Sequence, residues 1–158
     1  MLIDDAVEAA VREGFAASVF EDPDQFDAAI DAILEQGDDF TINAFQLTIN
    51  VTAVVLQDLH DGDVPAEGDI EDLAQNFAET QENWSEVSAD LARTYMSAAV
   101  GEKPVLEVMD PGDVATTGLA VGGWLLAVYP PDEQEWTDYL DEVLHVLEGA
   151  QGEVDEEG

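Results

Sequence analysis

Residues 41–57 read TINAFQLTINVTAVVLQ, which is seventeen consecutive positions without a charged side chain. The chain of 158 residues that surrounds them carries 38 Asp and Glu against three Lys and Arg, for a formal net charge of −35 at pH 7. Charged side chains are almost never fully buried, whereas a segment that water seldom reaches has no need of them. A charge-free stretch in so acidic a chain therefore predicts a segment enclosed by the rest of the fold.

Two secondary structures compete for this segment. Apolar and polar residues alternate from Phe45 to Ala53, as in a half-buried strand, but the alternation ends at Val54. The triplet Thr-Ile-Asn occurs twice, seven residues apart, and seven residues are two helical turns. A helix that is apolar on most sides is a buried one. We predict a buried central helix over residues 40–59.

The polar residues of this helix fall in one narrow seam between two apolar stripes. The seam consists of Asn43, Gln46, Asn50 and Gln57, and the stripes of Ile42, Phe45, Ile49 and Leu56 and of Phe40, Leu47, Val51 and Val54. The seam is read as the solvent-facing strip of a mostly buried helix. Buried amides that fix register or oligomeric state across a helix pair, or a ligand site, are the alternatives. We take Asn43, Asn50 and Gln57 as interface candidates.

A heptad pattern follows the loop at residues 60–68. Apolar residues recur every seven positions at Ile70, Phe77, Trp84, Leu91 and Ala98. The pattern predicts one helix over residues 69–100, about 45 Å long at 1.5 Å per residue. So long a helix needs a comparably long partner, from this chain or from a second copy, and an exposed Trp84 would mark a partner contact.

Further helices are predicted at residues 5–20, 23–36 and 133–148 from N-capping Asp residues and helical periodicity. Residues 102–131 fit either a buried helix whose glycines allow close packing or a pair of strands. We expect one helical domain over residues 1–148.

The fold expected from these elements is an all-α bundle of five or six helices, with helix 69–100 packed on the central helix 40–59. The alternative is an α+β fold with a small sheet from residues 45–55 and 104–128. Residues 149–158 are read as a flexible acidic tail.

The charge balance points to a saline environment. The chain has abundant Asp and Glu, a single lysine (Lys103) and many Ala, Val and Gly, and in this it resembles proteins of salt-in halophilic archaea or their viruses. Salt at 1 M shortens the Debye length to about 3 Å, so the carboxylates would scarcely repel one another. We expect that monovalent salt is required for stability. Mimicry of a nucleic-acid backbone, aimed at a basic partner, is the alternative explanation.

Location and binding classes follow from the same composition. Three basic residues are too few for direct nucleic-acid binding. The N-terminus has acids at Asp4 and Asp5 where a signal peptide needs basic residues, and the uncharged run 114–129 falls short of about 20 residues needed to span a bilayer. We expect a cytoplasmic protein, or a virion-associated one if the chain is viral, with no membrane contact.

Few residues offer catalytic chemistry. The chain has no cysteine, no phosphate-binding loop and no nucleophile motif, so we assign no catalytic residue and no cofactor. Glu142 and His145 have the Glu-x-x-His spacing of di-iron bundles, but the further glutamates that such a site needs are absent from the predicted inward positions. His60, Asp61 and Asp63 gather possible metal ligands in a loop that does not match a calcium-binding pattern.

Three functions remain as hypotheses. The leading one is a non-catalytic interaction or assembly protein, which acts through helix faces and self-associates through the heptad helix. The second is a metal-binding or metal-dependent hydrolytic protein that uses acids with His60 or His145. The third is the nucleic-acid mimic, which requires one continuous acidic stripe.

Overall fold

The computed structural model describes residues 4–60, 62–85, 87–101, 105–129 and 134–157, and it describes side chains as far as Glu148. These residues form eight helices: α1 Asp5–Val19, α2 Pro23–Glu35, α3 Asp38–Leu59, α4 Glu67–Gln81, α5 Ala89–Val100, α6 Val105–Val108, α7 Pro111–Val128 and α8 Trp136–Glu157. The all-α prediction is confirmed. The alternative sheet is wrong, because residues 45–55 lie within α3 and the described part of 104–128 includes α6 and α7 but no strand.

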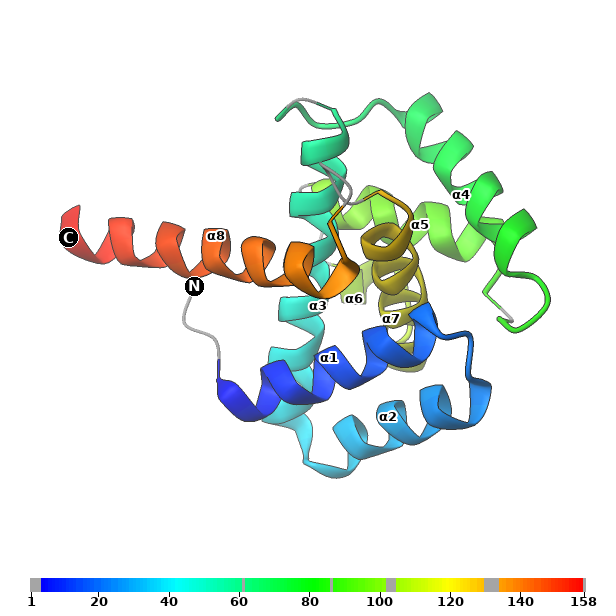
Figure 1. Cartoon of the computed structure of the whole chain (residues 1–158), viewed down its shortest axis with the longest axis horizontal. Helices are drawn as coiled ribbons and strands as arrows, with labels where there is room; N and C mark the ends of the chain where they lie inside the picture. Colours follow the sequence, from blue (N-terminus) through cyan, green and yellow to red (C-terminus); the bar gives the residue numbers. More distant parts are fainter. Residues whose placement is uncertain (1–3, 61, 86, 102–104, 130–133, 158) are drawn as a thin grey trace.

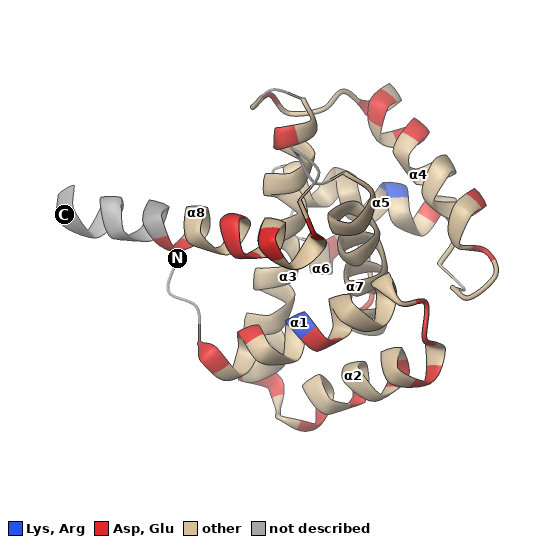
Figure 2. Ribbon diagram, in the orientation of Figure 1, with Lys and Arg blue, Asp and Glu red and all other residues tan. Residues whose placement is uncertain are grey.

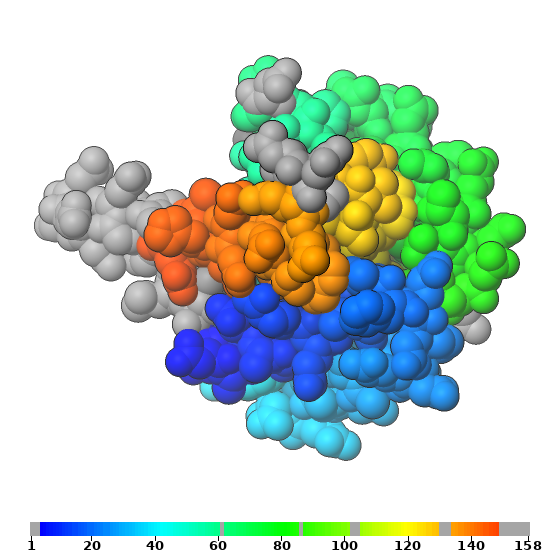
Figure 3. Space-filling view, in the orientation of Figure 1, coloured from blue at the N-terminus to red at the C-terminus, as the bar shows by residue number. Residues whose placement is uncertain are grey.

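Helix α7 lies at the centre of the molecule (Figure 1) and packs against α1, α3, α5 and α8. Helix α2 lies against α1, and α4 lies against α5 on the opposite side. In the space-filling view α8, in orange, covers α7 next to α1, in blue (Figure 3). One hydrophobic cluster draws residues from α1 through to α8, so these helices share a single core.

Every side chain of α7 from Thr117 to Leu126 is buried. Its glycines explain how neighbouring helices come so close. A Cβ atom on Gly122 would lie 2.5 Å from Cε1 of Phe15, and one on Gly118 would lie 2.9 Å from Cγ2 of Thr48. Of the two readings of residues 102–131, the buried helix is confirmed for residues 111–128. The burial gained against α1 and α3 offsets the poor helix propensity of glycine.

The central helix predicted at residues 40–59 is confirmed as α3, but it is only partly buried. One face, which includes Leu47, Val51 and Val55, packs into the core. Ile42, which we placed in an apolar stripe, is 53% exposed and stands on the opposite side of the helix. The prediction of an enclosed rod is wrong on this face, since no described helix covers it.

By length and composition α3 is also the one described helix that could cross a membrane, and 50% of its most apolar window is buried inside the fold. The core helix of a soluble protein passes the same test.

The single helix predicted over residues 69–100 is wrong. Two helices, α4 and α5, fold back on each other as a hairpin, with a turn after Gln81. Serine side chains take the place of helical hydrogen bonds there, because Ser85 Oγ accepts from the N–H of Val87 at 3.2 Å and Ser88 Oγ accepts from that of Leu91 at 3.2 Å. Helices α4 and α5 therefore pack against each other within one chain, so the heptad pattern does not require a second chain.

The ends of the first two helices are as predicted. Asp4 accepts from the backbone N–H groups of Ala6 and Val7, and Asp22 accepts from that of Gln25 at 3.1 Å. At the other end of the chain, α8 continues to Glu157, so the backbone of residues 149–157 is helical. The flexibility of this acidic tail stays a prediction.

Candidate functional site

His60 is the first of the predicted metal ligands, and both of its ring nitrogens face protein atoms. Nδ1 lies 2.8 Å from the carbonyl oxygen of Leu56, and because a carbonyl only accepts, Nδ1 carries the proton. Nε2 lies 3.6 Å from Oδ2 of Asp69, a contact that becomes an ion pair when the ring is protonated. This histidine joins the end of α3 to the start of α4.

The other candidate ligands do not gather around one point in the described structure. Glu142 accepts a hydrogen bond from Nε2 of Gln134 at 2.9 Å, while His145 is exposed on α8 and Asp63 is exposed after α3. Asp61 lies outside the described residues. Within the part of the chain that the structure describes, no three His, Asp or Glu side chains are placed to hold a metal ion. The geometry therefore gives the metal hypothesis no support.

The interface candidates are placed in two different regions. On α3, Asn43 is exposed and Gln57 is half-buried, and Asn50 accepts from Nε2 of Gln46 at 3.3 Å. That bond runs along α3 from one turn to the next, which favours a solvent-facing strip. Trp84 lies in the turn between α4 and α5, with its ring 5.2 Å from that of Phe26 in an edge-on contact.

Trp84 also donates from Nε1 to Oε1 of Gln81 at 2.7 Å, so both its ring and its polar atom are engaged within the chain. It fastens the α4–α5 turn to α2. The role of these residues at an interface stays a prediction.

A groove runs between the open face of α3 and the α5–α6 segment, by which we mean the described residues 98–101 and 105–108. Its volume is about 370 Å³, and it is lined by Ile42, Phe45, Gln46, Ile49, Asn50, Ala98, Ala99, Gly101, Val105 and Leu106. Phe45 and Val105 are buried and lie deepest in it, whereas Ile42 and Leu106 are 53% and 46% exposed. Water therefore touches two large aliphatic side chains at the borders of one hollow.

None of the described residues that line this groove carries a charge. Figure 2 shows Asp and Glu on the outer helices α1, α2, α4 and α8, while the middle of α3 and the part of α7 that follows Asp113 are without them. Charge returns directly beyond Leu106, which also borders a hollow lined by Asp90, Glu107, Asp110 and Asp113. The described lining of the groove is thus uncharged and mostly apolar, with acids on the side beyond Leu106, and we call it the neutral groove.

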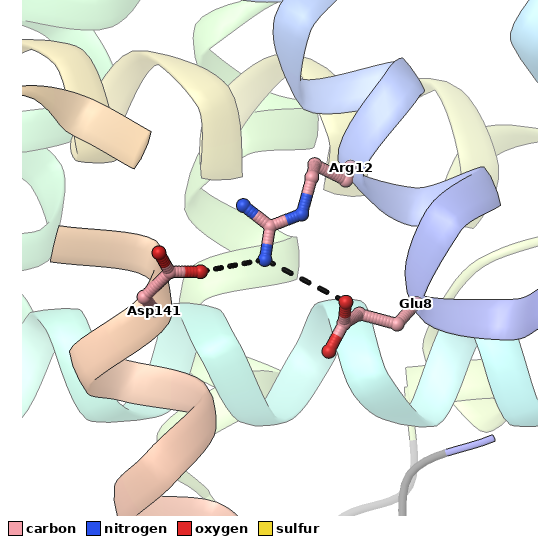
Figure 4. A network of polar contacts seen from close by, with 3 residues as sticks. All are labelled: Glu8, Arg12 and Asp141. Carbon is pink, nitrogen blue, oxygen red and sulfur yellow. Dashed lines mark hydrogen bonds and ion pairs between the residues drawn. The ribbon is translucent and has the colours of Figure 1, made fainter. Parts of the chain in front are cut away.

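The acids in Figure 2 are scattered over separate helices and do not form one stripe in this view. Basic residues are too few to form a patch of their own. Arg12 is held between α1 and α8, with Nη2 2.8 Å from Oδ1 of Asp141 and 3.6 Å from Oε2 of Glu8 (Figure 4). Arg93 is exposed on α5, and Lys103 lies outside the described residues.

The chemistry available in the neutral groove is that of contact. Aliphatic side chains offer area to remove from water, and the exposed amide of Gln46 can both donate and accept hydrogen bonds. Its described lining residues include no nucleophile, acid or base. The sequence does not predict the groove, because it places Ile42 in an apolar stripe and because Leu106 lies in residues 102–131, which fit either a helix or strands. The one sequence signal for the groove is the absence of charge over residues 41–57.

Comparison with protein-family models, with curated proteins and with solved structures finds no match for the chain.

Proposed function

We propose that this protein is a non-catalytic interaction protein of a high-salt environment, and that it binds its partner through the neutral groove. The observation that carries the proposal is the contrast between the groove and its surroundings. A chain with a net charge of −35 leaves ten lining residues without a single charge and exposes Ile42 and Leu106 among them. Depletion of charge is what distinguishes the centre of a protein interface from the remaining surface.

Core packing does not account for the apolar residues at the borders of this groove. Ile42 is more than half exposed, so the fold gains little from it, and a carboxylate there would suit the rest of the surface better. Exposed aliphatic side chains that cluster in a hollow are typical of a contact site. The polar rim that interfaces also need is supplied by Gln46 and Asn50.

Catalysis has less support from the same structure. Both ring nitrogens of His60 face protein atoms. A separate hollow beside His60 is lined by Leu59, Asp69, Asp72, Leu73, Asn76 and Tyr129. The buried hydroxyl of Tyr95 contacts Thr52 and is closed off from solvent. These groups hold helices together and do not converge on a place for a substrate.

The proposal is tested by a charge placed in the groove. Immobilised wild-type protein and the Ile42→Asp variant would be exposed to an extract of a halophilic archaeon in multimolar KCl. We expect proteins that the wild type retains and the variant loses, because a carboxylate buried in a contact pays a desolvation cost that salt does not remove.

The matched control is Ala28→Asp, which adds the same charge at an exposed position of α2 outside the groove. It should retain what the wild type retains. Equal retention of extract proteins by wild type and Ile42→Asp, together with equal self-association of the two and with both folded by circular dichroism, would remove the proposal.

A further inference from the structure

We infer that the occupant of the neutral groove is a second copy of this chain, so that the protein forms a symmetric dimer through α3 and the α5–α6 segment. The inference rests on the proposed function, because it identifies the partner of the same groove. It replaces the heptad helix, which folds back within one chain, as the site of self-association.

The first argument is charge. A basic partner would be drawn to carboxylates, and the groove offers none among its ten lining residues. A partner as acidic as this chain has the opposite requirement, since contact is possible only where neither surface must desolvate a carboxylate. A second copy carries the same −35 charge and the same neutral groove, so neither of the two surfaces brings a carboxylate from its described lining residues into the contact.

The second argument is the kind of polar group in the groove. In a two-fold dimer each surface patch meets itself, so its hydrogen-bonding groups must complement their own copies. Carboxylates fail this test because they only accept, whereas an amide both donates and accepts. Gln46 is exposed and uses one N–H in its bond to Asn50, which leaves its second N–H and its carbonyl oxygen for the Gln46 amide of the other copy.

The third argument is shape. Ile42 and Leu106 line a hollow of about 370 Å³ and are exposed, whereas Phe45 and Val105 line it and are buried. Two copies related by a two-fold axis would each place an exposed aliphatic side chain toward the hollow of the other. Both hollows are then filled, which a flat partner surface would not achieve.

The dimer is expected to depend on salt. Two molecules of charge −35 repel each other strongly in dilute buffer, and at 1 M salt the Debye length of about 3 Å confines that repulsion to near contacts. Association should therefore be favoured in brine. This dependence is opposite to that of a complex held by ion pairs, which weakens as salt is added.

Sedimentation equilibrium in multimolar KCl tests the inference on the full chain. The wild type is expected at twice the chain mass of 17.0 kDa. Ile42→Asp should weaken dimerisation by about a hundredfold or more, because it buries an unpaired carboxylate in each half of the contact. Gln46→Glu should act in the same direction, and since it keeps the shape of an exposed side chain it tests the groove even if Ile42→Asp unfolds. Ala28→Asp should remain dimeric.

A wild type that stays monomeric in brine would overturn the second-copy inference, as would a dimer that neither groove variant weakens. The proposed function has its own criterion. A monomeric wild type that still loses captured proteins on Ile42→Asp would refute only the dimer, whereas groove variants without effect on any association would refute both.

Discussion

At the scale of single residues, the closest packing in the molecule is between α1 and α7. A Cβ atom on Gly123 would lie 2.6 Å from Cβ of Ser18 and 3.0 Å from the backbone oxygen of Phe15. Ser18 Oγ in turn donates to the carbonyl oxygen of Ala120 at 3.0 Å. The two helices meet backbone to backbone, so this contact allows no side chain at position 123.

Gly123→Ala is therefore expected to destabilise the fold by about 1–3 kcal/mol, the usual range for overpacking a core, despite the better helix propensity of alanine. The matched control is Gly112→Ala in the first turn of the same helix, where a Cβ atom would meet nothing within 4 Å. The control should be neutral or gain up to about 1 kcal/mol. Urea unfolding in brine measures both, and equal effects of the two substitutions would refute this account of the α1–α7 contact.

A second residue-scale feature is the buried pair of hydroxyls between α5 and α3. Thr52 Oγ1 donates to the carbonyl oxygen of Thr48 at 3.0 Å, so it accepts from the hydroxyl of Tyr95 at 3.1 Å. Burial raises the pKa of Tyr95 well above its usual value of 10.0, although the hydrogen bond with Thr52 acts in the other direction. Burial and the hydrogen bond to Asp58 likewise raise the pKa of Tyr139.

A raised pKa means that the folded protein keeps these protons more tightly than the unfolded chain. Stability from this source is fully present below pH 10.0 and falls as the pH rises toward the folded-state pKa. We expect Tyr95→Phe to lower the free energy of unfolding by about 0.5–1.5 kcal/mol at neutral pH. The variant should also lose less stability than the wild type as the pH is raised above 10.0. Urea unfolding as a function of pH measures both, and an unchanged alkaline slope in Tyr95→Phe would contradict the assignment to Tyr95.

At the scale of elements, the hairpin of α4 and α5 depends on how α5 begins. Ser88 is the N-cap of α5 and accepts from the backbone N–H of Leu91. Ser88→Ala should lower the free energy of unfolding by about 1 kcal/mol, and Ser88→Asn should restore it, because asparagine caps as well as serine does. Denaturant unfolding of the three proteins checks this, and equal losses in both variants would show that the cap does not stabilise α5.

The elements that could be predicted from sequence are those with local signals. Asp4 and Asp22 cap α1 and α2 through bonds to residues two or three positions on, and the seven-residue echo in α3 is periodicity within one helix. The break after Gln81 was not predictable from apolar spacing, since the heptads continue through it. Only the capping potential of Ser85 and Ser88 indicated it.

Two features of the structure, the helix α7 and the neutral groove, depend on tertiary packing and not on local sequence signals. The sequence of residues 102–131 fits either a buried helix with closely packed glycines or a pair of strands. The structure decides for the helix, because Phe15 and Thr48 fill the space beside Gly122 and Gly118. The neutral groove was equally hidden, because α3 and the α5–α6 segment supply its two sides. A wheel of α3 alone places Ile42 among apolar residues and gives no sign that its neighbours leave it open.

At the scale of the whole molecule, charge governs stability. Thirty-eight acids on a chain of 158 residues repel one another in the compact state, and few of them have cationic partners. We expect the unfolding temperature to rise with KCl, and most of the rise to occur below about 1 M, where the Debye length shortens to about 3 Å. Sucrose is the uncharged control, because it stabilises without screening. Scanning calorimetry that shows no response to KCl would contradict this dependence on screening.

The central claim is that two copies of this acidic chain meet at the neutral groove. Because the chain has no cysteine, single thiols can be placed at will, one at Gln46→Cys in the groove and one at Gln75→Cys on the exposed side of α4. The measurement is the fraction of chains joined by a short bis-maleimide in multimolar KCl. The account predicts efficient joining through position 46 and little through position 75. Equal joining at both positions, or joining at 75 alone, would contradict it.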